Sequence, residues 1–191
     1  MTDRRAASAA LAHWSQSLRA ARSRRRRLAR RSLAIAGLAA ALAATIALPP
    51  RPLFVWNASA SAPIGLYRVG RTDPATGDMV IAWPPAAARD FAARRHYLPI
   101  NVPLVKRITA EPGDTVCALG PRIFVNGRRV ARRLVRDGVG RPMPWWIGCV
   151  TLRQGAMFLL MTDSPASFDG RYFGPTKRGD IVGKATLLWA R

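Results

Sequence analysis

The sequence is poor in the residues that build most metal centres and histidine-dependent active sites. Its 191 residues include two histidines, two cysteines and a single glutamate, Glu111. His96 is the only histidine beyond the N-terminal region, and its neighbours Arg94 and Arg95 are typical of a solvated loop, which argues against a Ser-His-Asp triad. The scarcity of His and Cys argues against structural zinc. Neither a glycine-rich phosphate loop nor an HExxH motif is present.

Acidic residues are also scarce, with 10 Asp and Glu against 31 Lys and Arg and a net charge of +21. Such a charge suggests a nucleic acid or an anionic membrane surface as a partner. The basic residues are concentrated in residues 1–31, which hold ten arginines and one acid. Ser32–Leu48 follows without a charged residue and would be about 25 Å long as a helix, within the range for crossing a membrane.

The sequence therefore predicts three segments: a basic cytoplasmic leader (1–31), a transmembrane anchor (32–48) and an extracytoplasmic domain (49–191). The arginines assign the N-terminus to the cytoplasmic side. Two alternatives for the hydrophobic stretch are a cleaved signal peptide, against which the long leader argues, and a buried alanine-rich helix. Because the leader's charge is explained by topology, nucleic acid is retained only as a minor alternative partner.

Beyond the expected anchor, short β-rich runs alternate with turn residues, which predicts a mainly β domain. The expected strands are Gly65–Val69, Asp78–Trp83, Leu104–Ala110, Thr115–Leu119, Ile123–Val125, Arg128–Val130, Cys149–Leu152, Met157–Met161 and Asp180–Trp189. Asn126-Gly127 predicts a two-residue hairpin turn, since both positions of a type I′ turn need positive φ. One short helix is expected within residues 84–95.

Lysine is rare, since only three of the 31 basic residues are lysines. Serine chemistry without histidine commonly uses lysine as the base, and burial must then lower the lysine pKa by about 3 units. Strand alternation places Lys106 on one face with Leu104 and Ile108, where it is a candidate for a desolvated base. The alternative is a lysine whose ammonium reaches solvent at the edge of a sheet.

The candidate nucleophiles are Ser59 and Ser61, in a segment of small residues shortly after the expected anchor. Taken alone, this segment has the composition of an inert linker that enters a strand. A catalytic role therefore depends on the rest of the sequence.

The two cysteines, Cys117 and Cys149, both follow the expected anchor. In an oxidising compartment they can form a disulfide, which would stabilise the domain by roughly 3–4 kcal/mol. The alternative is a pair of unpaired buried thiols.

Three sequence boxes occur in an order that resembles the signal peptidase I family of Ser/Lys proteases. They are Ser-x-Ser-x-Pro-x-Gly-Leu-Tyr at 59–67, Pro-Leu-Val-Lys-Arg-Ile-Thr-Ala-Glu-Pro-Gly-Asp at 103–114 and Ser-Phe-Asp-Gly-Arg-Tyr-Phe-Gly-Pro at 167–175. The resemblance covers about residues 32–190. The short spacing between Ser61 and Pro63, Gly65-Leu66-Tyr67 and the two cysteines resemble the TraF-like branch, which matures conjugative pilins.

The resemblance implies a catalytic dyad in which Ser61 is the nucleophile and Lys106 the general base. The Ser61 N–H and the Ser59 hydroxyl would form the oxyanion hole. Ser59 as the nucleophile is the alternative assignment.

The third box supplies supporting residues by the same resemblance. Ser167 would hold the Lys106 ammonium, and Asp169 and Arg171 would pair to fix their loop. Ser167 as a plain turn serine is the alternative. Gly170 departs from the serine that is usual in this box, which puts one secondary hydrogen bond in doubt.

The resemblance further implies an antiparallel β domain whose apolar face rests on the bilayer, and an enzyme without a metal or cofactor. We expect a serine endopeptidase anchored in the bacterial inner membrane, with its catalytic domain in the periplasm, that processes a precursor protein, a conjugative pilin, through an acyl-enzyme. The alternatives are a housekeeping type I signal peptidase and a non-enzymatic, membrane-tethered component of the transfer machinery.

Overall fold

The N-terminal part of the chain is one long helix. The computed structural model describes residues 2–47, 52–153 and 155–191, and the chain divides into two compact units, Met1–Pro50 and Arg51–Arg191. The first unit contains α1 (Thr2–Ala47, 46 residues). Its part from Arg22 to Ala47 is exposed, and is long and apolar enough to cross a membrane. Leu48, the end of the expected anchor, lies outside the described residues.

Helix α1 also includes the leader, for which the sequence pattern predicted no element. Alanine and arginine are both strong helix formers, and the leader contains neither glycine nor proline. The side chains of Arg24–Arg27, Arg30 and Arg31 are exposed. The cationic and apolar segments are therefore parts of one helix.

The second unit is mainly β, as predicted, and ten strands lie among its described residues. They are β1 (Phe54–Asn57), β2 (Gly65–Gly70), β3 (Met79–Ala82), β4 (Leu104–Ala110), β5 (Thr115–Leu119), β6 (Arg122–Val125), β7 (Arg128–Arg132), β8 (Gly148–Thr151), β9 (Phe158–Leu159) and β10 (Ile181–Ala190). The helices are α2 (Ala86–Arg94), α3 (Gly170–Phe173) and the 3₁₀ turn Arg178–Asp180.

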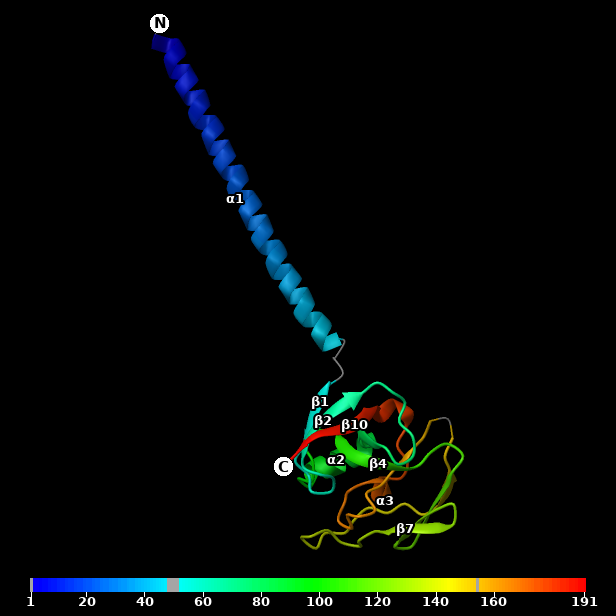
Figure 1. Ribbon diagram of the computed structural model, residues 1–191. Coiled ribbons are helices and arrows are strands. Elements are labelled where there is room, and N and C mark those ends of the chain that lie inside the picture. The colour runs from blue at the N-terminus through cyan, green and yellow to red at the C-terminus, as the bar shows by residue number, and fades with distance from the viewer. Residues whose placement is uncertain (1, 48–51, 154) are drawn as a thin grey trace. The chain divides into compact units, whose positions relative to one another are not determined.

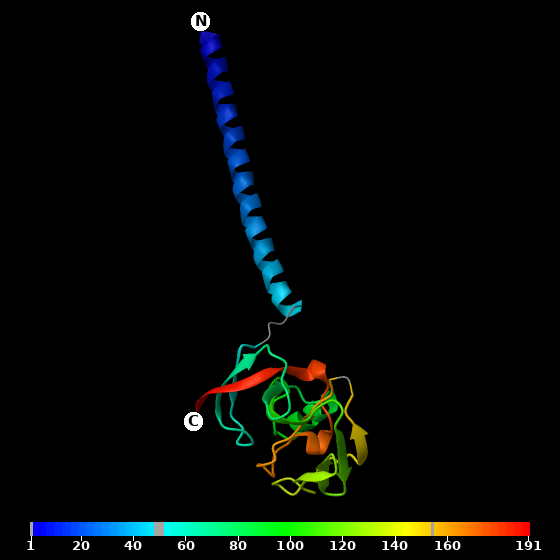
Figure 2. The same cartoon turned by 45° about the vertical axis from the view of Figure 1, so that its right-hand side comes forward.

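The strands form two antiparallel sheets. The six-stranded sheet has the order β1-β2-β10-β3-β4-β9, and the four-stranded sheet has the order β7-β6-β5-β8. Figures 1 and 2 show β10, in red, running beside the cyan strands β1 and β2. The last strand of the chain thus pairs with β2, the strand that follows the Ser61 segment.

Two turns of the second unit connect its strands, and the first of them is the predicted hairpin turn. Asn126 and Gly127, between β6 and β7, have φ values of 49° and 78°, as a type I′ hairpin requires. Glu111 and Asp114 close a turn directly after β4, where the Asp114 N–H donates to the Glu111 carbonyl at 3.0 Å.

Three elements differ from the sequence-based expectation. β1 was not among the expected strands, and it is an edge strand paired with β2. The expected strand Met157–Met161 is shortened to the two residues of β9. The one-turn helix α3 was not expected; the Asp169 side chain caps it by accepting from the Arg171 N–H. Such short elements have no periodicity of their own and depend on tertiary contacts.

The core of the second unit includes a cluster beneath the Ser61 segment and another against the four-stranded sheet. The first cluster consists of Ala62, Tyr67, Ile81, Val105, Met161 and Ala185. The second consists of Ala110, Val116, Ala118, Ile123, Leu152, Phe158 and Leu160. Because Ala62 belongs to the first cluster, the Ser61 segment is packed onto the core and is no free linker.

Candidate active site

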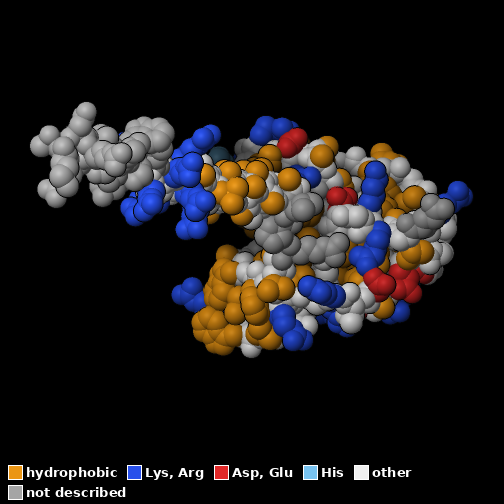
Figure 3. All heavy atoms as spheres, turned by 90° about the horizontal axis from the view of Figure 1, so that it is seen from above, with side chains coloured by type: hydrophobic (Ala, Val, Ile, Leu, Met, Phe, Trp, Pro, Cys, Tyr) orange, Lys and Arg blue, Asp and Glu red, His pale blue; other side chains and the backbone are white. Residues whose placement is uncertain are grey.

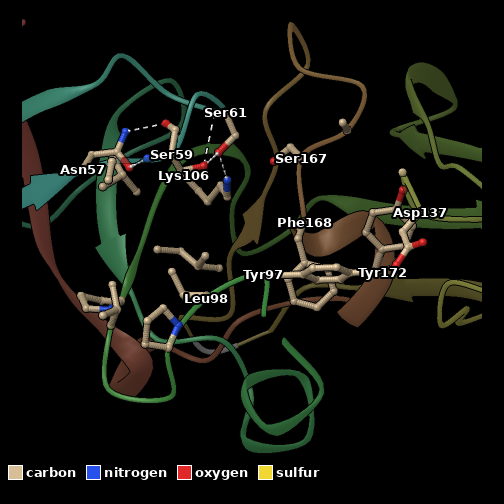
Figure 4. A pocket seen from close by; sticks show the side chains of 18 of the residues that line it. Asn57, Ser59, Ser61, Tyr97, Leu98, Lys106, Asp137, Ser167, Phe168 and Tyr172 are labelled. Atoms are coloured by element: carbon tan, nitrogen blue, oxygen red, sulfur yellow. Dashed lines mark hydrogen bonds between the residues drawn. The ribbon is translucent and has the colours of Figure 1, made fainter. Parts of the chain in front are cut away.

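Ser61 and Lys106 come together from distant parts of the second unit. Ser61 lies in the loop between β1 and β2, and Lys106 lies in the middle of β4. Lys106 Nζ donates a hydrogen bond to Ser61 Oγ at 2.6 Å, although the two residues are 45 positions apart. Figure 4 shows this contact as a dashed line. A nucleophile and its base must lie within about 2.6–3.2 Å of each other, and this pair meets that requirement.

Lys106 is buried, with only 2% of its surface exposed. Leu104 and Ile108 on its strand face are buried as the alternation predicted, but Val105 on the opposite face is buried too. Strand β4 has neighbours on both sides in its sheet, β3 and β9. The alternative of a lysine that reaches solvent therefore does not describe Lys106.

The buried environment changes the acidity of Lys106. Desolvation lowers its pKa from 10.5 to about 8; the negative charge of Asp169 raises this pKa and the positive charge of Arg171 lowers it. An amine with a pKa near 8 is partly neutral close to physiological pH, so it can accept a proton. An ordinary exposed lysine is almost fully protonated there.

Ser59 and Ser61 present neighbouring polar groups. The two Oγ atoms are 3.0 Å apart, and the Ser61 N–H points to Ser59 Oγ at 3.4 Å. The two groups that the resemblance assigns to an oxyanion hole are therefore adjacent, and they contact each other in this structure. The hydrogen bond from Lys106 goes to Ser61, which favours Ser61 over Ser59 as the nucleophile.

Asp169 and Arg171 form a buried ion pair. Arg171 Nε lies 2.8 Å from Asp169 Oδ1, and the two side chains are 1% and 0% exposed. Arg171 also donates to the main-chain carbonyls of Arg132, Pro165 and Met161. The pair thus ties the segment that contains Ser167 to the strands around it.

Ser167 is buried beside the site, but its hydroxyl has no hydrogen-bond partner among the described residues. The expected hydrogen bond between Ser167 and Lys106 is therefore not formed in this structure. Both side chains line the same cleft. A buried hydroxyl without a partner costs about 1–3 kcal/mol.

The serines and Lys106 line a cleft of about 640 Å³. Figure 4 shows Tyr97, Phe168, Tyr172 and Asp137 in another part of it. The Tyr97 hydroxyl donates to the Asp137 carboxylate, which also accepts from Arg141 Nε at 2.7 Å. These hydrogen bonds hold the pKa of Asp137 well below its usual range, although desolvation opposes them.

Sequence reasoning missed this polar and aromatic part of the cleft, as well as Asn57. The Tyr97–Asp137 contact joins residues 40 positions apart, and no local motif marks either residue. Asn57 ends β1 just before the serines, and its position beside Ser59 and Ser61 was the only available signal.

His96 and the cysteines lie apart from this site. His96 is exposed with φ of 59° and is absent from the residues that line the cleft. Cys117 and Cys149 stand directly opposite each other on β5 and β8 and form a disulfide. The structure thus decides for the disulfide, the pairing that the sequence left open.

Comparison with known proteins gives matches over most of the chain. The model of the signal peptidase family, peptidase S26, matches residues 25–190. A probable conjugal transfer protein TraF of Sinorhizobium fredii is 33% identical over 174 residues, covering 85% of this chain and 91% of its own. A plasmid transfer protein TraF of Escherichia coli is 30% identical over 145 residues, covering 70% and 82%. A signal peptidase I of Enterococcus faecalis has a similar solved structure, with 21% identity, a TM-score of 0.36 and coverage of 61% and 100%.

Proposed function

The chain belongs to the signal peptidase family, peptidase S26, and from this premise we propose that it is a membrane-anchored serine endopeptidase with a Ser61–Lys106 dyad. The observation that carries the proposal is the 2.6 Å hydrogen bond between Ser61 Oγ and a lysine that is 2% exposed. Burial supplies a base near neutral pH, and the hydrogen bond connects that base to the nucleophile.

In the proposed reaction, the neutral amine of Lys106 accepts the Ser61 proton while Ser61 Oγ attacks the carbonyl carbon of the scissile bond. The Ser61 N–H and the Ser59 hydroxyl turn from each other toward the developing oxyanion. Protonated Lys106 then donates its proton to the departing amine, and an acyl-enzyme on Ser61 remains. Attack by water releases an acid, whereas attack by an amine of the same polypeptide gives a cyclic product. Both resolutions keep the same dyad.

The proposed substrate is a precursor protein, and specifically a conjugative pilin precursor cleaved after a small residue. The family supports a precursor as the substrate. The conjugal and plasmid transfer relatives, whose sequences this chain matches over most of their length, support a role in conjugation.

We propose that residues 1–31 are a cytoplasmic leader, 32–48 the anchor and 49–191 the periplasmic peptidase domain, at the inner membrane. Figure 3 shows the arginines of α1 gathered next to its hydrophobic stretch, as expected for a span whose cationic end stays in the cytoplasm. Exposed apolar side chains on β1 and β10 support contact of the peptidase domain with the bilayer; they include Phe54, Trp56, Leu188 and Trp189. The Trp56 and Trp189 rings are 5.7 Å apart.

The test is processing of a candidate pilin precursor in cells that express the full chain or its Ser61→Ala variant. The wild-type chain should yield the mature pilin, and the variant should leave the precursor intact at an equal level of membrane-inserted protein. Full processing by Ser61→Ala would show that the dyad is misassigned.

Deletion of residues 1–27 separates the peptidase from a non-enzymatic component that acts through its leader. The deleted peptidase should still process the precursor, with some loss of correct insertion, whereas a leader-dependent scaffold should lose its role in transfer. Processing of many unrelated secreted precursors would instead indicate a housekeeping signal peptidase.

A further inference from the structure

The side chain of Asn57 forms several hydrogen bonds with the main chain of the loop that carries Ser61. This residue ends β1, pairs with Gly65 at the start of β2 and is 7% exposed. Its Nδ2 donates to the main-chain oxygens of Ser59 at 2.9 Å, Pro63 at 3.0 Å and Ala62 at 3.1 Å. Its Oδ1 accepts from the Ser59 N–H at 3.1 Å.

These contacts involve main-chain groups both before and after Ser61 in the sequence. Asn57 holds both the N–H and the carbonyl of Ser59 on one side of Ser61 and two carbonyls on the other side. The loop has no strand or helix of its own to fix it. The backbone around Ser61 therefore takes its shape chiefly from this carboxamide, and Tyr67 adds one contact by donating to the Pro63 carbonyl at 2.8 Å.

We propose that Asn57 is a positioning residue for the nucleophile, a role that rests on the proposed peptidase function. Its carboxamide fixes the loop so that Ser61 Oγ lies within reach of Lys106 Nζ. The same contacts set where the Ser61 N–H and the Ser59 hydroxyl stand for the oxyanion. Asn57 itself touches neither the scissile bond nor Lys106 in this scheme.

The chemistry of the position calls for a primary amide. An amide presents two N–H donors and one acceptor in a single plane. The three carbonyl oxygens lie around the two N–H groups, so at least one N–H is shared between two of them, and Oδ1 accepts from the Ser59 N–H. A carboxylate of the same shape would accept from the Ser59 N–H but would face three carbonyl oxygens with negative charge. A neutral amide also leaves the charges around Lys106 unchanged, since that pKa depends on burial, Asp169 and Arg171.

The test uses the full-length protein in detergent and a peptide that spans the processed junction of the pilin precursor. For Asn57→Asp and Asn57→Ala we expect kcat to fall about 100-fold while KM changes less than about threefold, because a small misplacement of the reacting groups costs that much. The rising limb of the pH profile should keep the wild-type pKa for Asn57→Ala.

Asn126→Gly is the matched control. Asn126 also makes side-chain hydrogen bonds, to Asp114 and to the Thr115 N–H, but it lies in the β6–β7 turn, where its positive φ suits glycine. Its loss should lower the melting temperature without lowering kcat. If Asn57→Ala does not fold, Asn57→Ser and Asn57→Asp decide, with their melting temperatures measured beside the control.

The outcomes separate the two proposals. Activity of the folded Asn57 variants within about threefold of wild type would overturn the role of Asn57 and leave the dyad standing. A kcat loss as large in Asn126→Gly as in the Asn57 variants would also overturn it, because the effect would then follow general stability. An unprocessed precursor would overturn the peptidase function itself, and cleavage that survives Ser61→Ala would show that the dyad is misassigned.

Discussion

Lys106 Nζ donates to Ser61 Oγ at 2.6 Å from the middle of β4, on the strand face that it shares with the buried residues Leu104 and Ile108. The strands that flank the Ser61 loop, β1 and β2, belong to the same sheet as β4, with β10 and β3 between β2 and β4. Tertiary packing thus produces both the proximity of the pair and the low pKa of the amine.

Lys106→Met should abolish activity and stabilise the fold. Loss of a dyad member should lower kcat by about 10⁴-fold or more, and a neutral side chain of similar length removes the cost of burying an ammonium. In the wild type, the free energy of unfolding should rise from about pH 8 to about pH 10.5, because the unfolded chain binds more protons there. Denaturant titrations of Lys106→Met should show no such rise in the free energy of unfolding between these pH values. Lys177→Met, at an exposed position, is the control. It should change neither kcat nor the pH dependence of the free energy of unfolding.

The activity should increase with pH through the pKa of Lys106. Since the neutral amine is the base, kcat/KM should rise about tenfold per pH unit below about 8 and level off above it. Steady-state cleavage of the junction peptide between pH 6 and 10 measures this limb. A profile that falls as pH rises through 8 would show that a protonated lysine is the required form.

Ser167→Ala should separate activity from stability. Because the Ser167 hydroxyl has no partner among the described residues, its removal should leave the melting temperature unchanged or slightly higher. If the hydroxyl holds Lys106 once that residue is protonated, kcat should fall about 10-fold or more with little change in KM. Wild-type kcat in Ser167→Ala would identify Ser167 as a plain turn serine.

The Asp169–Arg171 pair should be important for stability. Asp169→Asn leaves a buried guanidinium without its charge partner, and we expect the free energy of unfolding to fall by about 3–5 kcal/mol. Asp73→Asn is a matched control, because Asp73 also pairs with an arginine, Arg178, but is 87% exposed. Its effect should stay below about 1 kcal/mol. An equal fall in the free energy of unfolding of the two variants would show that burial does not make the Asp169–Arg171 pair more important for stability.

The disulfide should stabilise the four-stranded sheet. Replacing Cys117 and Cys149 together by serine should lower the free energy of unfolding by about 3–4 kcal/mol, since the bridge closes a loop across a sequence separation of 32. Thermal unfolding with and without a thiol reductant measures this effect. The reductant should lower the melting temperature of the wild type and leave that of the double variant unchanged.

Much of the β domain was predictable from the sequence. The alternation in β4 and β5 gave their exact bounds, and Asn126-Gly127 gave the hairpin, because these signals are local. β1 and α3 were not predicted. Each is four residues long, which is too short to show a periodicity: β1 forms by pairing with β2, and the Asp169 carboxylate caps α3.

The sequence by itself determined the apolar helix behind an arginine-rich leader, the two serines and the lone lysine on an apolar strand. These features follow from composition and from the spacing of residues, which can be read directly from the sequence. Only the tertiary structure decided that Lys106 is buried and reaches Ser61, that Asn57 contacts the main chain on both sides of Ser61, and that the Ser167 hydroxyl has no hydrogen-bond partner among the described residues. Burial and hydrogen-bond geometry depend on which strands pack together, and that arrangement joins residues about 45 positions apart.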